Sequence, residues 1–283
     1  TAWAPAVAQV GDVTIAISGG GDAKRASALR DEVSAALQTG ELPLRHRTHR
    51  KGQVALVGGG PGDPGLITAR GRQLLASADV VVIDRLAPQS VLSELAEDVE
   101  VIDVGKQPDH HPIPQEQINE ILIEHAKAGK TVVRLKGGDP YVFGRGGEEL
   151  IACRDAGVDV EVVPGVTSAI AVAAAAGIPV THRGVSRGFS VVTGHEELDS
   201  LPTRSDHTIV LLMGVKRLAQ TVAEMIAAGH DEATPVAVIE RGFSPTQRTT
   251  IGTLATIGEL ASEAKSPAVV VIGDVVRLAT PAS

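Results

Sequence analysis

Residues 54–64 read VALVGGGPGDP, an apolar run that turns directly into a loop rich in glycine and proline. Such a run bounded by turn residues predicts a buried strand, and the stretch 66–78 after it is predicted to be helical. A strand such as 80–83, VVVI, is apolar on both faces, which is typical of a parallel sheet covered by helices on each side. The fold class is therefore α/β. Further strands are predicted at 80–84, 99–104, 131–135 and 158–163, and further helices at 89–96, 114–128 and 146–156.

A second set of elements begins near residue 189. An additional strand is predicted at 248–251, after the turn at 241–246, so this second sheet is expected to be mixed. Charge and glycine interrupt the pattern at 183–188, which places a domain boundary there and gives two α/β domains, 51–186 and 187–283. A crevice between two such domains is a common ligand site. The strands of this set are predicted at 189–193, 208–212, 235–240 and 268–272, and its helices at 217–228 and 256–264.

The first fifty residues stand apart from both sets. They hold a predicted strand at 13–18, a glycine turn, a helix at 22–37 and a basic linker at 43–51. One strand and one helix cannot bury a core of their own. Because the chain also begins at Thr1 without a signal-peptide pattern, we expect 1–50 to be the remnant of an upstream domain.

Composition excludes several classes of protein. Among 283 residues, 26 Lys and Arg stand against 34 Asp and Glu, a formal net charge of −8, whereas general nucleic-acid binders are basic. Aromatic residues make up 2%, too few for base-stacking platforms. The single cysteine, Cys153, excludes an internal disulfide and a multi-cysteine metal site, so we expect no metal and a reducing cytoplasm. The long uncharged stretch at 162–182 is broken by proline and glycine, so no membrane span is expected.

The glycine loop at 58–62 permits two interpretations besides a simple turn. One is a dinucleotide site, since Asp84 ends the next strand near the place of a ribose-binding acid. However, Asp63 occupies the place of the third glycine of that motif, and Pro61 and Pro64 remove backbone donors that would hold a pyrophosphate. The other interpretation is a different ligand at the same strand end.

Two further loops favour this second interpretation. The segment 136–140, KGGDP, and the segment 164–169, PGVTSA, also follow predicted strands. Loops at the carboxyl ends of parallel strands face one crevice, so we expect all three to line a single site. Its carboxylates, Asp63 and Asp139, suit a neutral or cationic ligand that carries hydroxyls and an amine.

Seven segments together resemble the uroporphyrinogen-III C-methyltransferases, in order and almost without gaps between about residues 53 and 278. The resemblance implies two α/β domains with S-adenosylmethionine between them, in a homodimer. It implies methylation of two pyrrole carbons of uroporphyrinogen III to give precorrin-2. Residues 13–37 resemble the end of the precorrin-2 dehydrogenase module of bifunctional sirohaem synthases. The sequence departs from the family at Gly59, usually alanine, and in a shorter stretch between His195 and Thr208. The segments are 58–64, 84–86, 104–106, 134–140, 163–169, 177–183 and 192–195.

The resemblance also implies roles for individual residues. Asp84 matches the proposed proton acceptor and Lys106 the proposed proton donor, although from position alone Asp84 is a helix N-cap after the strand and Lys106 a solvated loop residue. Local basic groups are expected to bind the substrate carboxylates, which a chain of negative net charge cannot attract globally. The expected cofactor-binding residues are Pro61, Gly137, Gly138, Asp139, Val142, Thr167, Ser168, Met213 and Gly242, and the expected substrate-binding residues are Arg85, His111, Arg134, Arg145 and Arg183.

Three other functions stay open from the sequence. The chain is alternatively a methylase of a later corrin intermediate, or it retains NAD-linked precorrin-2 dehydrogenase activity from a bifunctional parent. A tetrapyrrole-binding module without catalysis is the third.

Overall fold

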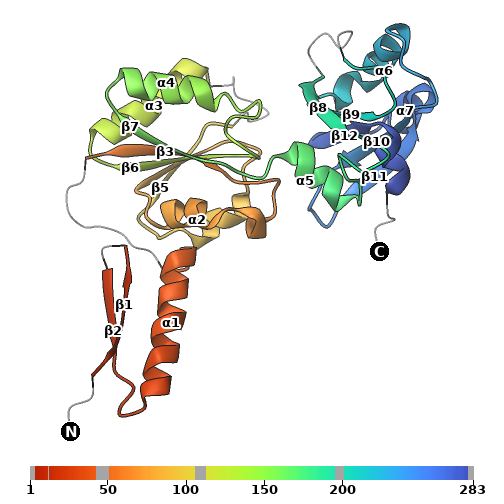
Figure 1. Cartoon of the computed structure of the whole chain (residues 1–283). Coiled ribbons are helices and arrows are strands. Elements are labelled where there is room, and N and C mark those ends of the chain that lie inside the picture. The colour runs from red at the N-terminus through yellow and green to blue at the C-terminus, as the bar shows by residue number, and fades with distance from the viewer. Residues whose placement is uncertain (1–3, 12, 43–50, 106–112, 195–200, 280–283) are drawn as a thin grey trace. The chain divides into compact units, whose positions relative to one another are not determined.

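A computed structural model describes residues 4–11, 13–42, 51–105, 113–194 and 201–279 (Figure 1). The chain divides into two compact units. Thr1–Gly59 and Pro64–Gly165 form the first, and Gly60–Asp63 and Val166–Ser283 form the second. None of the helices within these described ranges is both long and apolar enough to cross a membrane.

The first unit is built on a sheet of five strands, and every pair in it is parallel, as predicted. Val81 and Ile83 pack with α2 (Ala69–Ala76) on one face. Val80 and Val82 pack on the other face with α3 (Gln115–Lys127) and α4 (Gly146–Asp155), as Figure 1 shows. Full burial of a valine contributes roughly 1.5–3 kcal/mol, so a strand apolar on both faces stabilises this layered arrangement. The strand order is β5 (Glu100–Asp103), β4 (Val80–Ile83), β6 (Thr131–Lys136), β3 (Gln53–Gly58) and β7 (Asp159–Val163).

Two predicted helices of this unit are shorter than expected. α2 begins only after Thr68, whose hydroxyl caps it by accepting from the Gly71 N–H at 3.1 Å, and a 3₁₀ turn, η1 (Pro64–Leu66), precedes it. The helix predicted at 89–96 is a 3₁₀ helix, η2 (Gln89–Glu94).

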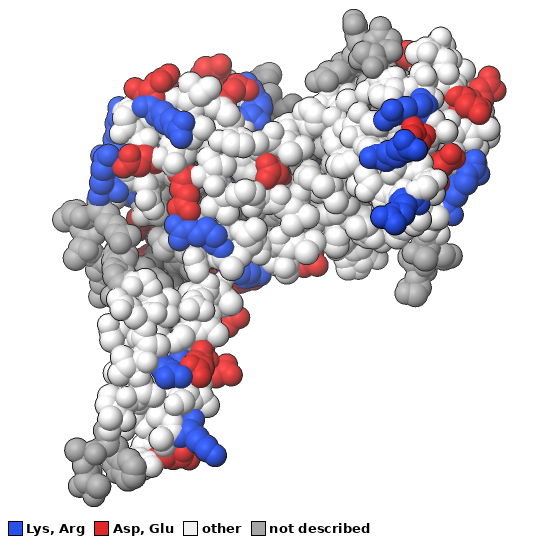
Figure 2. All heavy atoms as spheres, in the orientation of Figure 1, with Lys and Arg blue, Asp and Glu red and all other residues white. Residues whose placement is uncertain are grey.

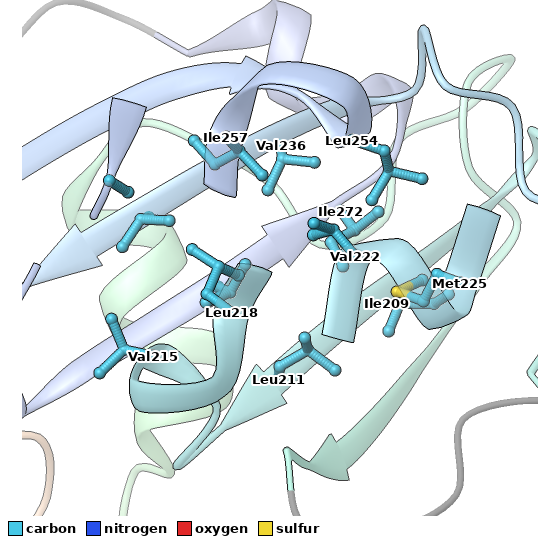
Figure 3. Packing of buried hydrophobic residues seen from close by; sticks show 13 residues of the cluster. Ile209, Leu211, Val215, Leu218, Val222, Met225, Val236, Leu254, Ile257 and Ile272 are labelled. Atoms are coloured by element: carbon cyan, nitrogen blue, oxygen red, sulfur yellow. The ribbon is translucent and has the colours of Figure 1, made fainter. Parts of the chain in front are cut away.

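The second unit has a mixed sheet, which confirms the prediction. β8 and β9 are parallel, and the other neighbouring strands are antiparallel. α6 (Leu218–Ala227) and α7 (Leu254–Leu260) cover one face, and Figure 3 shows their side chains packed against Leu211 and Val236 of the sheet. The strand order is β11 (Arg248–Thr253), β10 (Pro235–Glu240), β12 (Ala268–Ile272), β9 (His207–Leu212) and β8 (Gly188–Thr193).

The boundary between the units differs from the prediction. It falls at Gly165–Val166 rather than within 183–188, because α5 (Ser168–Ala175) packs on the second sheet. Ala169 and Val172 of this helix are buried in one cluster with Ile239 of β10. A helix of small apolar side chains carries no polar face, so its sequence does not indicate which sheet it covers.

The N-terminal segment adds a two-stranded sheet and a helix to the first unit. β1 (Ala6–Val10), which the sequence did not predict, pairs antiparallel with β2 (Val13–Ile17), and α1 (Ala23–Thr39) packs on them. Its cluster is small and centres on Val10, Ile15 and Leu37.

Candidate active site

The loops after β3, β6 and β7 lie against one another in the first unit. A Cβ atom added at Gly58 would lie 2.5 Å from the Gly165 Cα and 2.7 Å from the Gly138 carbonyl oxygen. At Gly165 an added Cβ would overlap the same carbonyl oxygen. Only glycine permits so close an approach of three backbones. The convergence expected of these loops is therefore present in the structure.

Asp139 ties two of these loops together. Its Oδ1 accepts from the Tyr141 N–H at 2.8 Å and its Oδ2 from the Gly165 N–H at 3.0 Å. A carboxylate oxygen has two acceptor positions, so each retains one for a ligand donor. The side chain is held in one orientation at the carboxyl end of β6.

Backbone strain gathers in the loops at the carboxyl ends of strands. Five non-glycine residues of the described chain have positive φ, and they follow β6, β9 or β10. Each such residue costs of order 1–3 kcal/mol, and such residues cluster at functional sites. Neighbouring glycines are the one feature of the sequence that indicates these conformations. The five residues are Phe143 at 53°, Arg145 at 58°, Met213 at 58°, Arg241 at 48° and Phe243 at 64°.

Asp84 follows β4 and combines a structural with a reactive position. Its Oδ1 accepts from the Leu86 and Ala87 N–H groups, both at 3.1 Å, so it caps a turn and not, as its position alone predicted, the start of a helix. Its Oδ2 lies 3.5 Å from Arg134 Nη2, and the side chain remains 29% exposed. One carboxylate oxygen is thus fixed by the turn, while the other lies beside a cation.

A buried ionic network lies beneath Asp84. Glu149 of α4 is fully buried, and its Oε1 accepts from Arg134 Nε at 3.0 Å and from Lys136 Nζ at 2.9 Å. Its Oε2 lies 3.0 Å from the same Nζ, and Gln115 donates to Oε1 at 3.3 Å. Burial lowers the pKa of Lys136 and the neighbouring Arg134 charge lowers it further, whereas Glu149 raises it. Residues 134 and 136 share one face of β6, so a single carboxylate reaches both.

This network corrects one prediction. Arg134 was expected among the residues that bind substrate carboxylates, but its side chain is only 4% exposed and is held by Glu149. While the ion pair with Glu149 is intact, the Arg134 guanidinium cannot reach a ligand at the surface. Sequence analysis missed Glu149 and Lys136, although an Arg and a Lys two positions apart in an otherwise apolar strand signal a buried counter-charge.

The other predicted substrate ligands are distributed between the units. Arg85 follows Asp84 and is exposed, and Arg145 is exposed and bound to Glu148 through both its Nε and Nη2, at 2.9 and 2.7 Å. Arg183 is exposed in the second unit. Lys106 and His111 lie outside the described residues. The described residues on the face shown in Figure 2 carry charges of both signs.

The predicted cofactor ligands also fall on both units. Gly137 and Gly138 follow β6, with Val142 partly buried in the same loop. Thr167 caps α5 through its hydroxyl, which accepts from the Ala169 N–H at 3.4 Å, and this is its simplest structural role. The others lie in the second unit: Pro61 in the loop 60–63, Ser168 at the start of α5, Met213 48% exposed after β9, and Gly242 after β10, packed against Val172.

Comparison with known proteins assigns the family. A profile described as "Tetrapyrrole (Corrin/Porphyrin) Methylases" matches residues 53–258, which include the loops after β3, β6 and β7. The chain belongs to the tetrapyrrole methylases. Its fold agrees: a structure of uroporphyrin-III C-methyl transferase from Thermus thermophilus complexed with S-adenyl homocysteine superposes with a TM-score of 0.71 and 42% identity. That match covers 80% of this chain and 100% of the other.

Two relatives of this tetrapyrrole methylase differ in how much of their own length the match covers. The S-adenosyl-L-methionine-dependent uroporphyrinogen III methyltransferase of Methanosarcina barkeri is 50% identical over 241 residues, 80% of this chain and 93% of the relative. Siroheme synthase 1 of Klebsiella pneumoniae is 46% identical over 265 residues, 92% of this chain and 54% of the relative. The chain therefore spans about half the length of that synthase.

Proposed function

We infer that this chain is a uroporphyrinogen-III C-methyltransferase, which transfers methyl groups from S-adenosylmethionine to two pyrrole carbons of uroporphyrinogen III and forms precorrin-2. The observation that carries the inference is the packing of Gly58, Gly138 and Gly165 with the Asp139 carboxylate at one edge of the sheet. It occurs in a chain 50% identical to a methyltransferase of this specificity over nearly that enzyme's whole length.

The charge of this edge favours S-adenosylmethionine over a dinucleotide. A carboxylate beside the glycine loops repels a pyrophosphate, whereas it attracts an amine and accepts from hydroxyls. Pro61 has no N–H to offer a phosphate. When bound, S-adenosylmethionine supplies an electrophilic methyl group. We propose that the residues that bind it are Pro61, Gly137, Gly138, Asp139, Val142, Thr167, Ser168, Met213 and Gly242.

The chain's main catalytic task is orientation. Holding a nucleophilic carbon in line with the bond to be broken supplies up to about 7–11 kcal/mol. Backbones packed as closely as those at Gly58 and Gly165 have little freedom to move, which suits a site that must keep two reactants aligned. The strained loops at Phe143 and Met213 are rigid for the same reason, because strain persists only where the surroundings impose it.

Asp84 is the proposed proton acceptor. A neutral pyrrole ring that gains a methyl cation equivalent becomes a cation, and loss of one proton restores neutrality. Asp84 Oδ2 is not used by the turn and belongs to a side chain that is 29% exposed, so it is the atom that accepts that proton. Lys106 is the proposed donor by resemblance, and Arg85, His111, Arg145 and Arg183 are proposed to bind the substrate carboxylates.

Further properties follow as proposals from the same assignment. The chain acts as a cytoplasmic homodimer on a small tetrapyrrole and binds neither nucleic acid nor membrane. We propose that residues 1–50 are the end of a precorrin-2 dehydrogenase module and that the product enters sirohaem synthesis.

Product analysis tests this function. Uroporphyrinogen III incubated with the chain and excess S-adenosylmethionine is expected to gain two methyl groups by mass spectrometry, with no response to NAD in calorimetry. Methylation only of a later corrin intermediate would assign the chain to another branch of the family. Tetrapyrrole binding without methyl transfer would reduce it to a binding module.

A further inference from the structure

The loop 241–247, which follows β10, is held in a conformation that its own backbone does not favour. It contains Gly242, one of the residues proposed above to bind S-adenosylmethionine. Arg241 and Phe243, on either side of this glycine, have φ angles of 48° and 64°. Such conformations persist only where the surroundings impose them, so contacts of the loop's side chains and neighbours must hold it.

The buried Glu240 fixes the place where the loop begins. Glu240 is 2% exposed, and its Oε1 accepts from the Lys265 N–H at 2.9 Å, while its Oε2 accepts from Arg248 Nε at 2.6 Å. The Arg241 N–H donates to the Pro267 carbonyl at 2.9 Å. The loop therefore leaves β10 from a fixed point.

The Gln247 side chain joins the loop to α5 through both polar atoms of its amide. Its Oε1 accepts from the Phe243 N–H at 3.0 Å, and its Nε2 donates to the Ala175 carbonyl at 3.2 Å. Ala175 is the last residue of α5, and the carbonyls of a helix's last turn have no partner within the helix. Gln247 therefore satisfies the end of this helix and closes the loop with the same group.

The two partners of Gln247 require one acceptor and one donor, and a single amide supplies both. A glutamate of the same length has only acceptors when it is ionised, and a methionine has no donor and only a weak acceptor. Turning the amide over would set its NH₂ group against the Phe243 N–H and its oxygen against the Ala175 carbonyl. The bonds thus select glutamine and one orientation of its amide.

A second contact places the loop on the same helix. A Cβ atom added at Gly242 would lie 2.8 Å from both methyl carbons of Val172, which is about one turn from Ser168 at the start of α5. Gln247 holds the loop farther along, at the end of that helix. Thr167 caps α5 at its other end. The helix therefore sets the position of Gly242 relative to the two hydroxyl residues that are proposed to bind the same ligand.

We propose that Gln247 is a positioning residue for S-adenosylmethionine. Its amide fixes the loop 241–247 on α5 and thereby fixes Gly242 relative to the start of that helix. This role rests on the proposed function, since it concerns the same ligand. Loss of the amide frees the loop to leave α5, so the cofactor binds less tightly, whereas methyl transfer in a chain saturated with cofactor changes little.

Calorimetry with S-adenosylhomocysteine on the whole chain tests this role. Gln247→Met and Gln247→Glu both remove the bond to Ala175, and each is expected to raise the Kd at least tenfold. The KM for S-adenosylmethionine is expected to rise by a similar factor, with kcat and the KM for uroporphyrinogen III nearly unchanged. Gln220→Met is the matched control, because the amide of Gln220 also has two partners, Arg217 and Glu224, but on the exposed face of α6. Its Kd is expected to equal that of the unsubstituted chain.

Hydrogen exchange gives a second readout, one that a general loss of stability would not reproduce. In Gln247→Met the Phe243 N–H is expected to exchange at least tenfold faster, while the amides of β10 keep their protection. An unchanged Kd in both Gln247 variants, when the unsubstituted chain binds S-adenosylhomocysteine, overturns the role of Gln247 alone. Equal weakening in Gln220→Met also overturns it. Absence of binding in the unsubstituted chain would contradict the proposed function itself.

Discussion

Arg134 Nη2 lies 3.5 Å from Asp84 Oδ2, while Arg134 Nε is bound at 3.0 Å to the fully buried Glu149. The proposed proton acceptor is thus connected through one guanidinium to a carboxylate in the interior. We interpret Arg134 as a positioning residue: it orients Asp84, and the buried Glu149 in turn orients Arg134.

Arg134→Lys is expected to lower kcat at least tenfold and to change the KM for uroporphyrinogen III much less. Lysine keeps the charge, but a single ammonium cannot bond Glu149 and reach Asp84 in the planar geometry of a guanidinium. Steady-state kinetics measure the effect, and calorimetry with S-adenosylhomocysteine is expected to show unchanged affinity.

A double-mutant cycle with Asp84→Asn separates positioning from a structural effect. If Arg134 acts through Asp84, the two substitutions are strongly non-additive in kcat. Additive losses would mean that Arg134 serves only the stability of the sheet.

Glu149→Gln is expected to reduce the free energy of unfolding by about 3–5 kcal/mol, because it removes the buried negative charge that pairs with both Arg134 and Lys136. Urea denaturation measures this loss. The matched control is Glu148→Gln on the same helix, whose side chain is 54% exposed and pairs with Arg145 at the surface. No measurable change is expected there, since water replaces the partner. Equal effects at both positions would contradict the buried network.

Gly165→Ala is expected to weaken the binding of S-adenosylhomocysteine at least tenfold. The added methyl group would overlap the Gly138 carbonyl oxygen, so the loops after β6 and β7 must separate. Gly147→Ala is the control, because a Cβ there meets nothing within 4 Å and the position lies inside α4. It is expected to keep the affinity and to raise stability by about 0.4–1 kcal/mol. Unchanged binding in Gly165→Ala would remove these loops from the cofactor site.

Part of this site was accessible from sequence for clear physical reasons. Apolar runs such as 80–83 require cover on both faces, and glycines at strand ends mark close approach, so the parallel sheet and the convergence at Gly58 and Gly165 followed. Glu149 was not accessible, because it stands beside Glu148 in the same helix and only the packing decides which one is buried.

The errors have similar causes. Arg134 was expected to bind substrate carboxylates because it lies near the end of a strand, among other basic residues, but the cover on both faces of β6 buries it. Apolar and polar residues alternate only weakly in β1, AVAQV, so its sequence does not indicate a strand. The strand is stabilised by its pairing with β2 and by the turn at Gly11. The mixed sheet of the second unit followed from sequence, but its boundary did not.

Cys153 predicts a stability loss at alkaline pH. Burial raises the pKa of its thiol to about 11, with the Glu149 charge adding to the effect, from an ordinary value of 9.0. Between these values the unfolded chain releases the thiol proton and the folded chain keeps it, so the folded state binds more protons. The free energy of unfolding therefore falls as pH rises through this window, by up to about 1.4 kcal/mol per pH unit. Burial lowers the pKa of Lys136, which changes the free energy of unfolding in the opposite direction over this pH range. The contribution of Cys153 is therefore measured as the difference between the pH profiles of the unsubstituted chain and of Cys153→Ala. Urea denaturation between pH 8 and 11 (roughly the window set by these pKa values) is expected to show a shallower decline for the variant. Identical pH profiles would show that this thiol ionises as readily in the folded chain as in the unfolded one.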